Sequence, residues 1–251
     1  MKRTKALATV AALSGLIFLL AGCGGTGLQD ISSGIAAAGS DVVKAATLSD
    51  EDVKTNALNA ARHLDGNAKV APKGDRYAKR LAKLVKNHTK EDGLDLNYKV
   101  YLTKDINAFA LADGSIRVYS GLMDMMTNDE LMFIIGHEMG HIKNGHHKEA
   151  LQMAYTASAA KKGAASQGGT TGALAGSVLG DFAEKLVNAQ FSQSEEKEAD
   201  DYGLKFLQRN NYNPNGAVTA LEKLAGLGGK HGIFSSHPDP EKRAKRIASQ
   251  L

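Results

Sequence analysis

Hydrophobic residues recur at helical spacing along most of the chain. Apolar positions three or four residues apart, in stretches opened by residues that cap or start helices, predict helices with one face turned to a core. Such stretches begin near Ser49, near Asp75, at about Asn128, near Asp181, after Asn213-Pro214 and after Asp239-Pro240. We therefore expect a mainly helical scaffold.

Between the second and third of these helices the hydrophobic period changes to two. Apolar positions alternate over residues 97–103, which predicts a β-strand. Residues 107–111 and 116–119 form a hairpin-like pair joined through Asp113-Gly114, a dipeptide suited to tight turns with positive φ. The pattern as a whole predicts an α+β fold that is mainly helical, with a small antiparallel sheet beside the third helix.

The third predicted helix has apolar side chains around most of its circumference. Thr127 and Glu130 have the spacing of a capping box, so the helix should begin at about Asn128. The apolar residues are Leu131, Met132, Phe133, Ile134, Ile135, Met139 and Ile142. This distribution indicates a helix that is buried on nearly all sides.

That helix also carries an H-E-x-x-H pattern at His137, Glu138 and His141. Residues four apart lie one turn above each other, so both imidazoles can reach the same zinc ion. Glu138 lies about 100° around the helix axis from His137, off the ligand face but within reach of a water molecule at the metal. The pattern predicts a zinc site with Glu138 as the general base. The alternative is a chance pattern with a solvated histidine pair.

The third metal ligand stays open between two candidates. His147 stands six residues after His141, as in the metzincin pattern, which would make it the ligand. However, Asn144 occupies the glycine position of that pattern, and no methionine follows Met153 to form the methionine turn. The other candidate is a carboxylate from the acidic run over residues 192–201.

In that acidic run, Glu196 and Asp200 lie one helical turn apart. If Glu196 binds zinc, Asp200 can accept a hydrogen bond from the free nitrogen of a ligand histidine. Spacing alone supports Glu195 or Glu198 nearly as well, and such a run is usually a solvated helix face.

A zinc endopeptidase needs an edge strand beside the metal, because an extended substrate is held by strand addition. We expect this strand to be the first of the hairpin, residues 107–111, with substrate contacts at Asn107, Ala108, Phe109 and Ala110. A purely structural hairpin is the alternative.

The N-terminus has the pattern of an export signal. A basic region precedes an apolar run over residues 6–21, which has signal-peptide length but is short for a transmembrane helix. The basic residues are Lys2, Arg3 and Lys5. We expect a signal peptide over residues 1–22.

The only cysteine of the chain, Cys23, follows Leu20-Ala21-Gly22. This stretch resembles the lipobox of bacterial lipoproteins, whose cysteine becomes the first residue and carries fatty-acyl chains such as palmitate. Acylation would hold the chain on a lipid bilayer without a spanning helix. We expect a lipidated flexible tether over residues 23–40 and one folded domain over residues 41–251. The alternatives are an ordinary signal peptide with a chance cysteine and an uncleaved anchor.

Composition agrees with one globular domain, since 43% of the 251 residues are hydrophobic. Most of the excess of basic over acidic residues lies in the predicted signal peptide. Removing residues 1–22 lowers Lys+Arg from 31 to 28 against 27 Asp+Glu, so the net charge falls from +4 to +1. This charge argues against binding to nucleic acid.

Four stretches together resemble a known enzyme family. In chain order they are the segments 107–111 and 116–123 (NAFAL and IRVYSGLM), HEMGH at 137–141, EKEAD at 196–200, and SHPDPEKR at 236–243. Their order is typical of the zinc metalloproteases that include HtpX, BepA and the CAAX-prenyl proteases. The resemblance runs from about Asp41 to the C-terminus and implies a zincin-like (gluzincin) α+β domain.

The resemblance implies a role for residues that spacing leaves open. The third ligand would be Glu196, the first glutamate of E-x-x-A-D. His237 and Arg243 would lie near the cleft, where either could stabilise the oxyanion and His237 could approach the zinc. Gln193 departs from the family, which often has an arginine there.

The remaining histidines match no motif and are expected to be solvated or at the surface. They are His63, His88, His146, His147 and His231. Residues 163–180 have no charge and many small side chains, which suits either a flap over the cleft or a disordered loop.

Signal and resemblance together imply an envelope-anchored endopeptidase with one Zn²⁺ per chain. Its substrates would be unfolded or misassembled envelope proteins. In a Gram-negative host, Gly24 after the lipidated cysteine favours the outer membrane, facing the periplasm. The alternative is an envelope chaperone or assembly factor with a latent protease site.

Overall fold

The computed structural model describes residues 39–43, 46–153, 155–156, 191–228 and 233–251. The helices are α3 (Asp50–Asn67), α4 (Arg76–Val85), α5 (Ser120–Met125), α6 (Asn128–Lys143), α9 (Gln193–Arg209), α10 (Asn215–Ala225), α11 (Ile233–Ser236) and α12 (Pro240–Ala248). The strands are β1 (Lys90–Glu91), β2 (Leu94–Asp95), β3 (Asn97–Tyr101), β4 (Ala108–Ala110) and β5 (Ser115–Tyr119). The predicted α+β fold, mainly helical, is confirmed.

Capping residues begin the main helices where the sequence predicts. Ser49 forms a capping box at the start of α3, and Thr127 forms one with Glu130 at the start of α6. The fourth helix differs from the expectation. Residues 181–190 lie outside the described residues, and α9 begins only after Ser192, which caps it. The Ser192 side chain favours a helix start there, because it accepts a hydrogen bond from the free backbone N–H of Glu195.

The main sheet has the strand order β3-β5-β4. β4 and β5 pair antiparallel through the predicted turn, in which Gly114 has a φ of 92°. β3 pairs with β5 in the parallel direction, and β4 lies on the far side of β5. The sheet is therefore mixed, and β4 lies at its edge; β1 and β2 form a separate small antiparallel pair.

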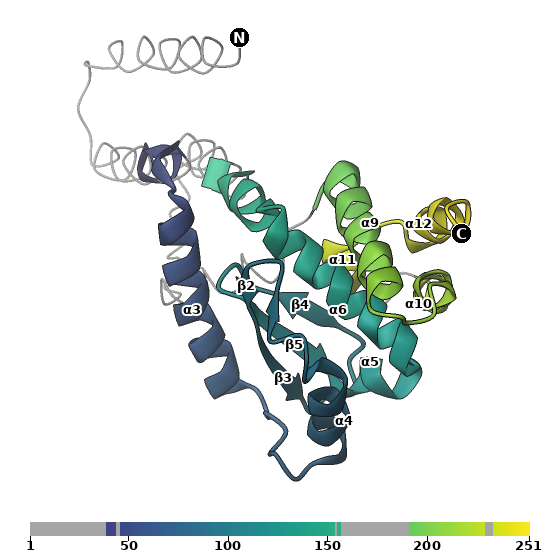
Figure 1. The fold of residues 1–251 in the computed structure, drawn as a ribbon. Coiled ribbons are helices and arrows are strands. Elements are labelled where there is room, and N and C mark those ends of the chain that lie inside the picture. Colours follow the sequence, from purple (N-terminus) through teal and green to yellow (C-terminus); the bar gives the residue numbers. More distant parts are fainter. Residues whose placement is uncertain (1–38, 44–45, 154, 157–190, 229–232) are drawn as a thin grey trace, which may run out of the picture.

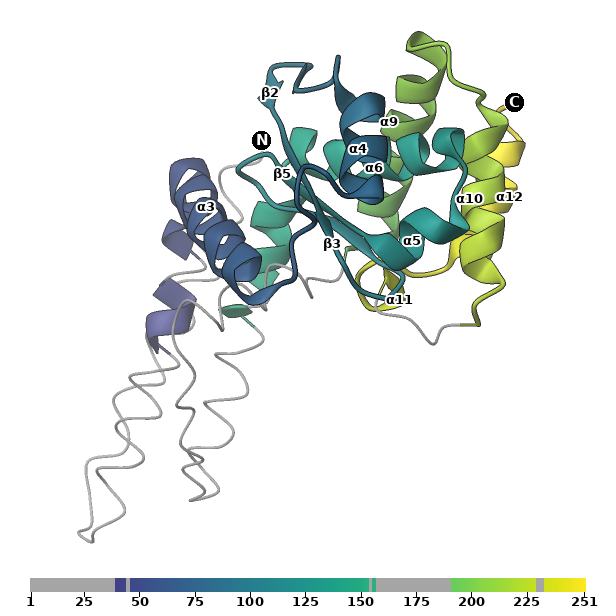
Figure 2. The same ribbon diagram turned by 90° about the horizontal axis from the view of Figure 1, so that it is seen from below.

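The elements stack in layers around α6 (Figure 1). α3 covers one face of the sheet through an apolar cluster that includes Ala57, Ala60, Tyr101 and Phe109. α6 lies on the other face, followed by α9, and its apolar side chains fill the main core. Figure 2 shows α10 and α12 together at the end of the molecule away from α3. α6 is thus enclosed, as its apolar circumference predicts.

Glycines bring α6 and α9 unusually close. A Cβ atom on Gly140 of α6 would lie 2.8 Å from Cα of Ala199 in α9. A Cβ atom on Gly203 of α9 would lie 3.1 Å from the backbone nitrogen of His137. Side chains at these positions would force the helices apart. The crossing point therefore falls on the turn of α6 that carries the two histidines.

Candidate metal centre

α6 presents both histidines of the H-E-x-x-H pattern to the same buried point. His137, Glu138 and His141 are all buried, because α6 lies between the sheet and α9. Nε2 of His137 is 3.0 Å from Nε2 of His141. The one-turn spacing therefore brings the two imidazoles together as predicted.

The facing turn of α9 supplies a carboxylate. Oε1 of Glu196 lies 3.3 Å from Nε2 of His141, and Oε2 lies 3.8 Å from Nε2 of His137. One turn later, Oδ1 of Asp200 is 3.0 Å from Nδ1 of His137. This is the contact expected of Asp200 if Glu196 faces the metal.

The other candidates for the third ligand face elsewhere. Glu195 completes the capping box of α9 with Ser192. The side chain of Glu198 is 62% exposed. Nε2 of His147 is 2.8 Å from the backbone oxygen of Ala110 in β4. Of the alternatives that spacing left open, Glu196 is the one that the fold brings to the two histidines.

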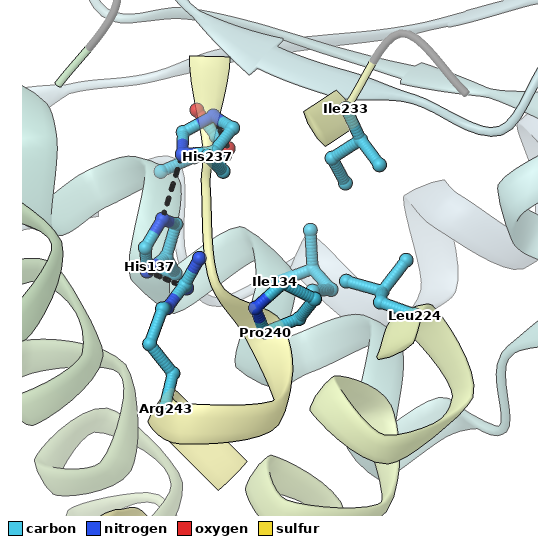
Figure 3. A pocket seen from close by; sticks show the side chains of 8 residues that line it. Ile134, His137, Leu224, Ile233, His237, Pro240 and Arg243 are labelled. Carbon is cyan, nitrogen blue, oxygen red and sulfur yellow. Dashed lines mark hydrogen bonds and ion pairs between the residues drawn. The ribbon is translucent and has the colours of Figure 1, made fainter. Parts of the chain in front are cut away.

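The C-terminal elements close the cluster with His237 and Arg243 (Figure 3). Nδ1 of His237 lies 2.8 Å from Oε1 of Glu196, and Nε2 lies 3.5 Å from Oε1 of Glu138. Arg243, on α12, places Nη1 2.5 Å from Oε2 of Glu196 and Nη2 2.6 Å from Oδ1 of Asp200. Both residues lie beside the cluster, as the resemblance implies.

The charges of the cluster follow from burial and from these contacts. Burial lowers the pKa of His141 well below its ordinary value, so this imidazole is neutral. Burial raises the pKa of Glu138, which favours its protonated form more than in water. Burial also opposes ionisation of Glu196, but the neighbouring histidines and Arg243 hold the pKa of its carboxyl below the usual range. Glu196 is therefore an anion beside a neutral imidazole.

This donor set fits a zinc ion. His137, His141, Glu196 and His237 are buried, and their ligand atoms lie within 4.8 Å of one another. The 3.0 Å between the two Nε2 atoms is close to the separation of about 3.3 Å that neighbouring ligands have around tetrahedral zinc with bonds of about 2.0–2.1 Å. Two histidines and one carboxylate are a known ligand set of catalytic zinc sites.

Strand β4 lies directly against the base candidate. The backbone N–H of Ala110 lies near the carboxylate of Glu138, where it lowers the pKa of that group and so opposes the effect of burial. The backbone oxygen of Asn107 accepts from Tyr119, and the N–H of Leu111 donates to Ser115. Because bonded and non-bonded pairs alternate in antiparallel strands, the backbone groups of Ala108 and Ala110 point away from β5. The predicted edge strand is thus an edge beside Glu138.

A small recess adjoins Glu138 and His237 (Figure 3). Its apolar wall comes from α6, α10, α11 and the start of α12, through Ile134, Leu224, Ile233 and Pro240. Chain segments far apart in the sequence therefore meet at the cluster.

Three histidines expected at the surface are buried, so that expectation was wrong for them. His146 and His147 turn back against α6 because Gly145 adopts a φ of 75°, which reverses the chain after the helix. His88 is covered by Phe206 and hydrogen-bonds Glu91 and Tyr212. His63 is half-buried, and His231 lies outside the described residues.

Other predictions fall largely or wholly outside the part of the chain that the structure describes. These are the signal peptide over residues 1–22, the tether with Cys23 over residues 23–40 and the segment 163–180. Only residues 39 and 40 of the predicted tether are described, and they are helical. Among the described residues, no helix has the length and apolar content needed to cross a bilayer.

Sequence reasoning missed two features of the site. Phe191 stacks on the ring of His141, with a centroid distance of 3.8 Å, and no pattern pointed to this aromatic residue. The close helix crossing was also missed, although small residues four apart, Gly136 and Gly140 on one helix and Ala199 and Gly203 on the other, were a readable signal.

Comparison with known proteins agrees with this geometry. Residues 71–251 match the model of the family described as Peptidase family M48. The chain is 46% identical over 232 residues to Metalloprotease LoiP of Escherichia coli (strain K12), covering 90% of this chain and 91% of that protein. It is 39% identical over 254 residues to Metalloprotease YcaL of the same organism, covering 100% and 98%. It is 26% identical over 213 residues to the Beta-barrel assembly-enhancing protease of E. coli, covering 76% and 42%.

The family match includes α6, α9 and the segment with His237 between α11 and α12, which together form the candidate metal cluster. The family resemblance seen in the motifs is thereby confirmed. M48 metalloproteases use zinc, and the buried cluster offers ligands for it. The chain belongs to peptidase family M48 and is a zinc metalloprotease.

Proposed function

We propose that this metalloprotease is an endopeptidase of the cell envelope that cleaves unfolded or misassembled proteins, with zinc held by His137, His141 and Glu196. The observation that carries the proposal is the buried cluster itself, with Glu138 on the same helix. Zinc supplies Lewis acidity there, which activates a water molecule and polarises the peptide carbonyl.

Glu138 acts as the general base in this proposal. It takes a proton from the attacking water and returns it to the leaving amine. Its burial between α6 and β4 and its raised pKa suit both steps, because a carboxylate of higher basicity accepts the proton more readily.

His237 and Arg243 have different parts in the proposed reaction. His237 lies next to both Glu138 and Glu196, where an N–H can stabilise the oxyanion of the intermediate. Arg243 bonds Asp200 and Glu196, so it positions these carboxylates instead of reaching the substrate.

The substrate would bind as an added strand along β4. Of the two residues whose backbone groups face away from β5, Ala110 already contacts His147 through its oxygen, and its N–H faces Glu138. Ala108 is therefore the residue we propose to pair with the substrate backbone. Strand addition needs an extended peptide, which agrees with unfolded proteins as substrates.

The envelope location rests on the N-terminal sequence. We propose that residues 1–22 are removed, that Cys23 is acylated and that residues 41–251 form the protease domain on a membrane surface. The printed name of one relative, Beta-barrel assembly-enhancing protease, agrees with substrates in the envelope. Cys23→Ser should abolish labelling by radioactive palmitate and release the protein from the membrane fraction. Unchanged labelling and membrane association would refute acylation at this site.

A second candidate is an envelope chaperone whose protease site is latent. It is favoured by the position of His237, whose Nδ1 lies 3.2 Å from Nε2 of His137 within the ligand cluster. A histidine in that place can compete with the substrate for the metal.

Cleavage of an unfolded protein separates the two candidates. Zinc-loaded full-length chain should cleave unfolded casein, and a chelator should stop it. Glu138→Gln should keep zinc and lose about 10²–10⁴-fold in rate, because only the base is removed. Glu149→Gln makes the same chemical change at an exposed position and should cleave as wild type.

Two outcomes would contradict the proposal. Equal cleavage by Glu138→Gln and wild type would remove the proposed mechanism. Binding of casein without chelator-sensitive cleavage would favour the chaperone.

A further inference from the structure

His146 lies buried against the metal cluster and links it to the protein surface. Its Nδ1 is 3.0 Å from Nδ1 of His141, and its Nε2 is 3.3 Å from Oε2 of Glu198. The side chain of His146 is 5% exposed, whereas that of Glu198 is 62% exposed. The three side chains form a continuous path from a proposed zinc ligand to solvent.

One assignment of protons to the ring nitrogens of His141 and His146 allows both hydrogen bonds of this path to form. Nε2 of His141 faces His137 and Glu196, so it must be unprotonated when it binds a metal, and Nδ1 then carries the proton. That N–H can donate only if Nδ1 of His146 is an acceptor. The proton of His146 therefore sits on Nε2 and is donated to Glu198.

The backbone brings His146 into this place. Asn144 ends α6 with its N–H bonded to the oxygen of Gly140, and Gly145 follows with a φ of 75°. This left-handed conformation suits glycine and turns the chain back toward the helix. Phe191 meanwhile stacks on the ring of His141 with an interplanar angle of 29°. The imidazole of His141 is thus held on its face by one residue and at Nδ1 by another.

We propose that His146 is a positioning residue of the metal site. It fixes the tautomer and ring orientation of His141 by accepting its Nδ1 proton, and Glu198 anchors it from the surface. Partners of this kind orient a ligand and raise its basicity, and their loss typically weakens metal binding by about 10–100-fold. The inference rests on the proposed ligand set, in which His141 binds zinc.

The test is the dissociation constant of Zn²⁺, measured on the full-length chain by competition with a chromophoric chelator. His146→Leu should bind zinc about 10–100-fold more weakly, because Nδ1 of His141 loses its acceptor. His146→Asn should bind within about threefold of wild type, since its side-chain oxygen can take the place of Nδ1 as an acceptor.

His88→Leu is the matched control. His88 is also a buried histidine with both nitrogens hydrogen-bonded, but its partners are Glu91 and Tyr212. Its loss should lower the thermal unfolding midpoint and leave the zinc dissociation constant unchanged. A purely structural role for His146 would make His146→Leu behave in the same way, which would overturn the proposal.

Glu198→Leu extends the test to an exposed position that poses little risk to folding. It should weaken zinc binding by about two- to fivefold, as expected for the loss of an exposed charged contact. Unchanged affinity in this variant, or His146→Asn as weak as His146→Leu, would overturn the proposal.

His141→Ala separates this inference from the proposed function. If His141→Ala retains zinc, the ligand set itself is wrong. If His141→Ala loses zinc while His146→Leu binds it as wild type does, only the role of His146 fails.

Discussion

The two histidines of α6 meet very different partners on their far sides. Nδ1 of His137 contacts Asp200, which is fully buried and held by Arg243 through two hydrogen bonds. Nδ1 of His141 contacts His146, which leads to an exposed carboxylate. On the His137 side the metal site is enclosed by buried charged residues, and on the His141 side it reaches solvent through the imidazole of His146 and the carboxylate of Glu198.

The difference shows what each side contributes. A buried carboxylate with a buried arginine is a strong orienting group, and removing either takes away the main partner of a buried charge. His146 orients its neighbour at less risk to the fold, since its own charged partner, Glu198, is exposed to solvent. Substitutions on the His137 side should therefore affect folding and metal binding together, whereas those on the His141 side should mainly affect metal binding.

The largest effect is expected for Asp200→Leu. Arg243 would lose its main partner in the core, so the free energy of unfolding of the zinc-free chain should fall by about 3–5 kcal/mol. Zinc affinity should fall by at least about 10–100-fold. Urea unfolding and chelator competition measure the two quantities.

Asp201→Leu is the control for that variant. The neighbouring carboxylate pairs with Arg246 at a half-exposed position and should contribute no more than about 1 kcal/mol. A loss for Asp200→Leu as small as this would contradict the distinction between the two sides.

Gly140→Ala should damage both sides of the site equally. Its Cβ atom would lie 2.8 Å from Cα of Ala199, so α9 must shift away with Glu196 and Asp200. We expect the free energy of unfolding to fall by about 1–3 kcal/mol, with weaker zinc binding. Gly66→Ala, in open space in α3, should instead stabilise by about 0.4–1 kcal/mol. Zinc binding by Gly140→Ala equal to wild type would show that the close crossing is not needed.

His147→Leu should leave the metal alone and affect the substrate. Burial lowers the pKa of His147 to about 4, so it is neutral at ordinary pH, and its Nε2–H can donate to the oxygen of Ala110. Without that bond β4 is held less firmly, and we expect KM to rise about fivefold, as for the loss of one hydrogen bond. Loss of zinc from this variant would contradict the assignment of His147 to the strand.

The smallest effect on the metal site is expected for a change at Asp65, the partner of the buried Arg117. Asp65 is partly buried, which opposes ionisation, but hydrogen bonds from Arg117, Lys99 and Tyr101 hold the pKa of this carboxyl below its usual value. The ionised Asp65 should therefore stabilise the folded chain fully above about pH 4, the pKa of an unfolded aspartate. This contribution to the free energy of unfolding should be lost as the pH falls through the lower pKa of the folded state.

Acid titration of the free energy of unfolding measures this contribution. Asp65→Asn should lose that part of the pH dependence below about pH 4 and bind zinc as wild type does. If the free energy of unfolding depends on pH in the same way in Asp65→Asn and wild type, the Asp65 contacts do not cause that dependence.

Local patterns predicted the starts of α3, α4, α6, α10 and α12, the hairpin and the position of His137 next to His141. These features depend on capping, on the turn at Gly114 and on the period of a single helix, all of which are written in neighbouring residues. The H-E-x-x-H pattern likewise needs no tertiary information to bring its histidines together.

The choice among the acidic residues of α9 could not be made from spacing. It depends on how α9 is rotated against α6, which the contact of Gly140 with Ala199 sets across about sixty residues of sequence. His146 and His147 were misjudged for a related reason. The direction of the chain after α6 depends on the φ of Gly145, and a sequence pattern does not give that angle.

The zinc content of two variants tests the central claim that His137, His141 and Glu196 hold the metal. Full-length Glu196→Ala, His147→Ala and wild-type chains would be purified with zinc, dialysed and measured by mass spectrometry for zinc per chain. We predict one zinc per chain for wild type and His147→Ala and none for Glu196→Ala. Zinc retained by Glu196→Ala and lost from His147→Ala would contradict the ligand set.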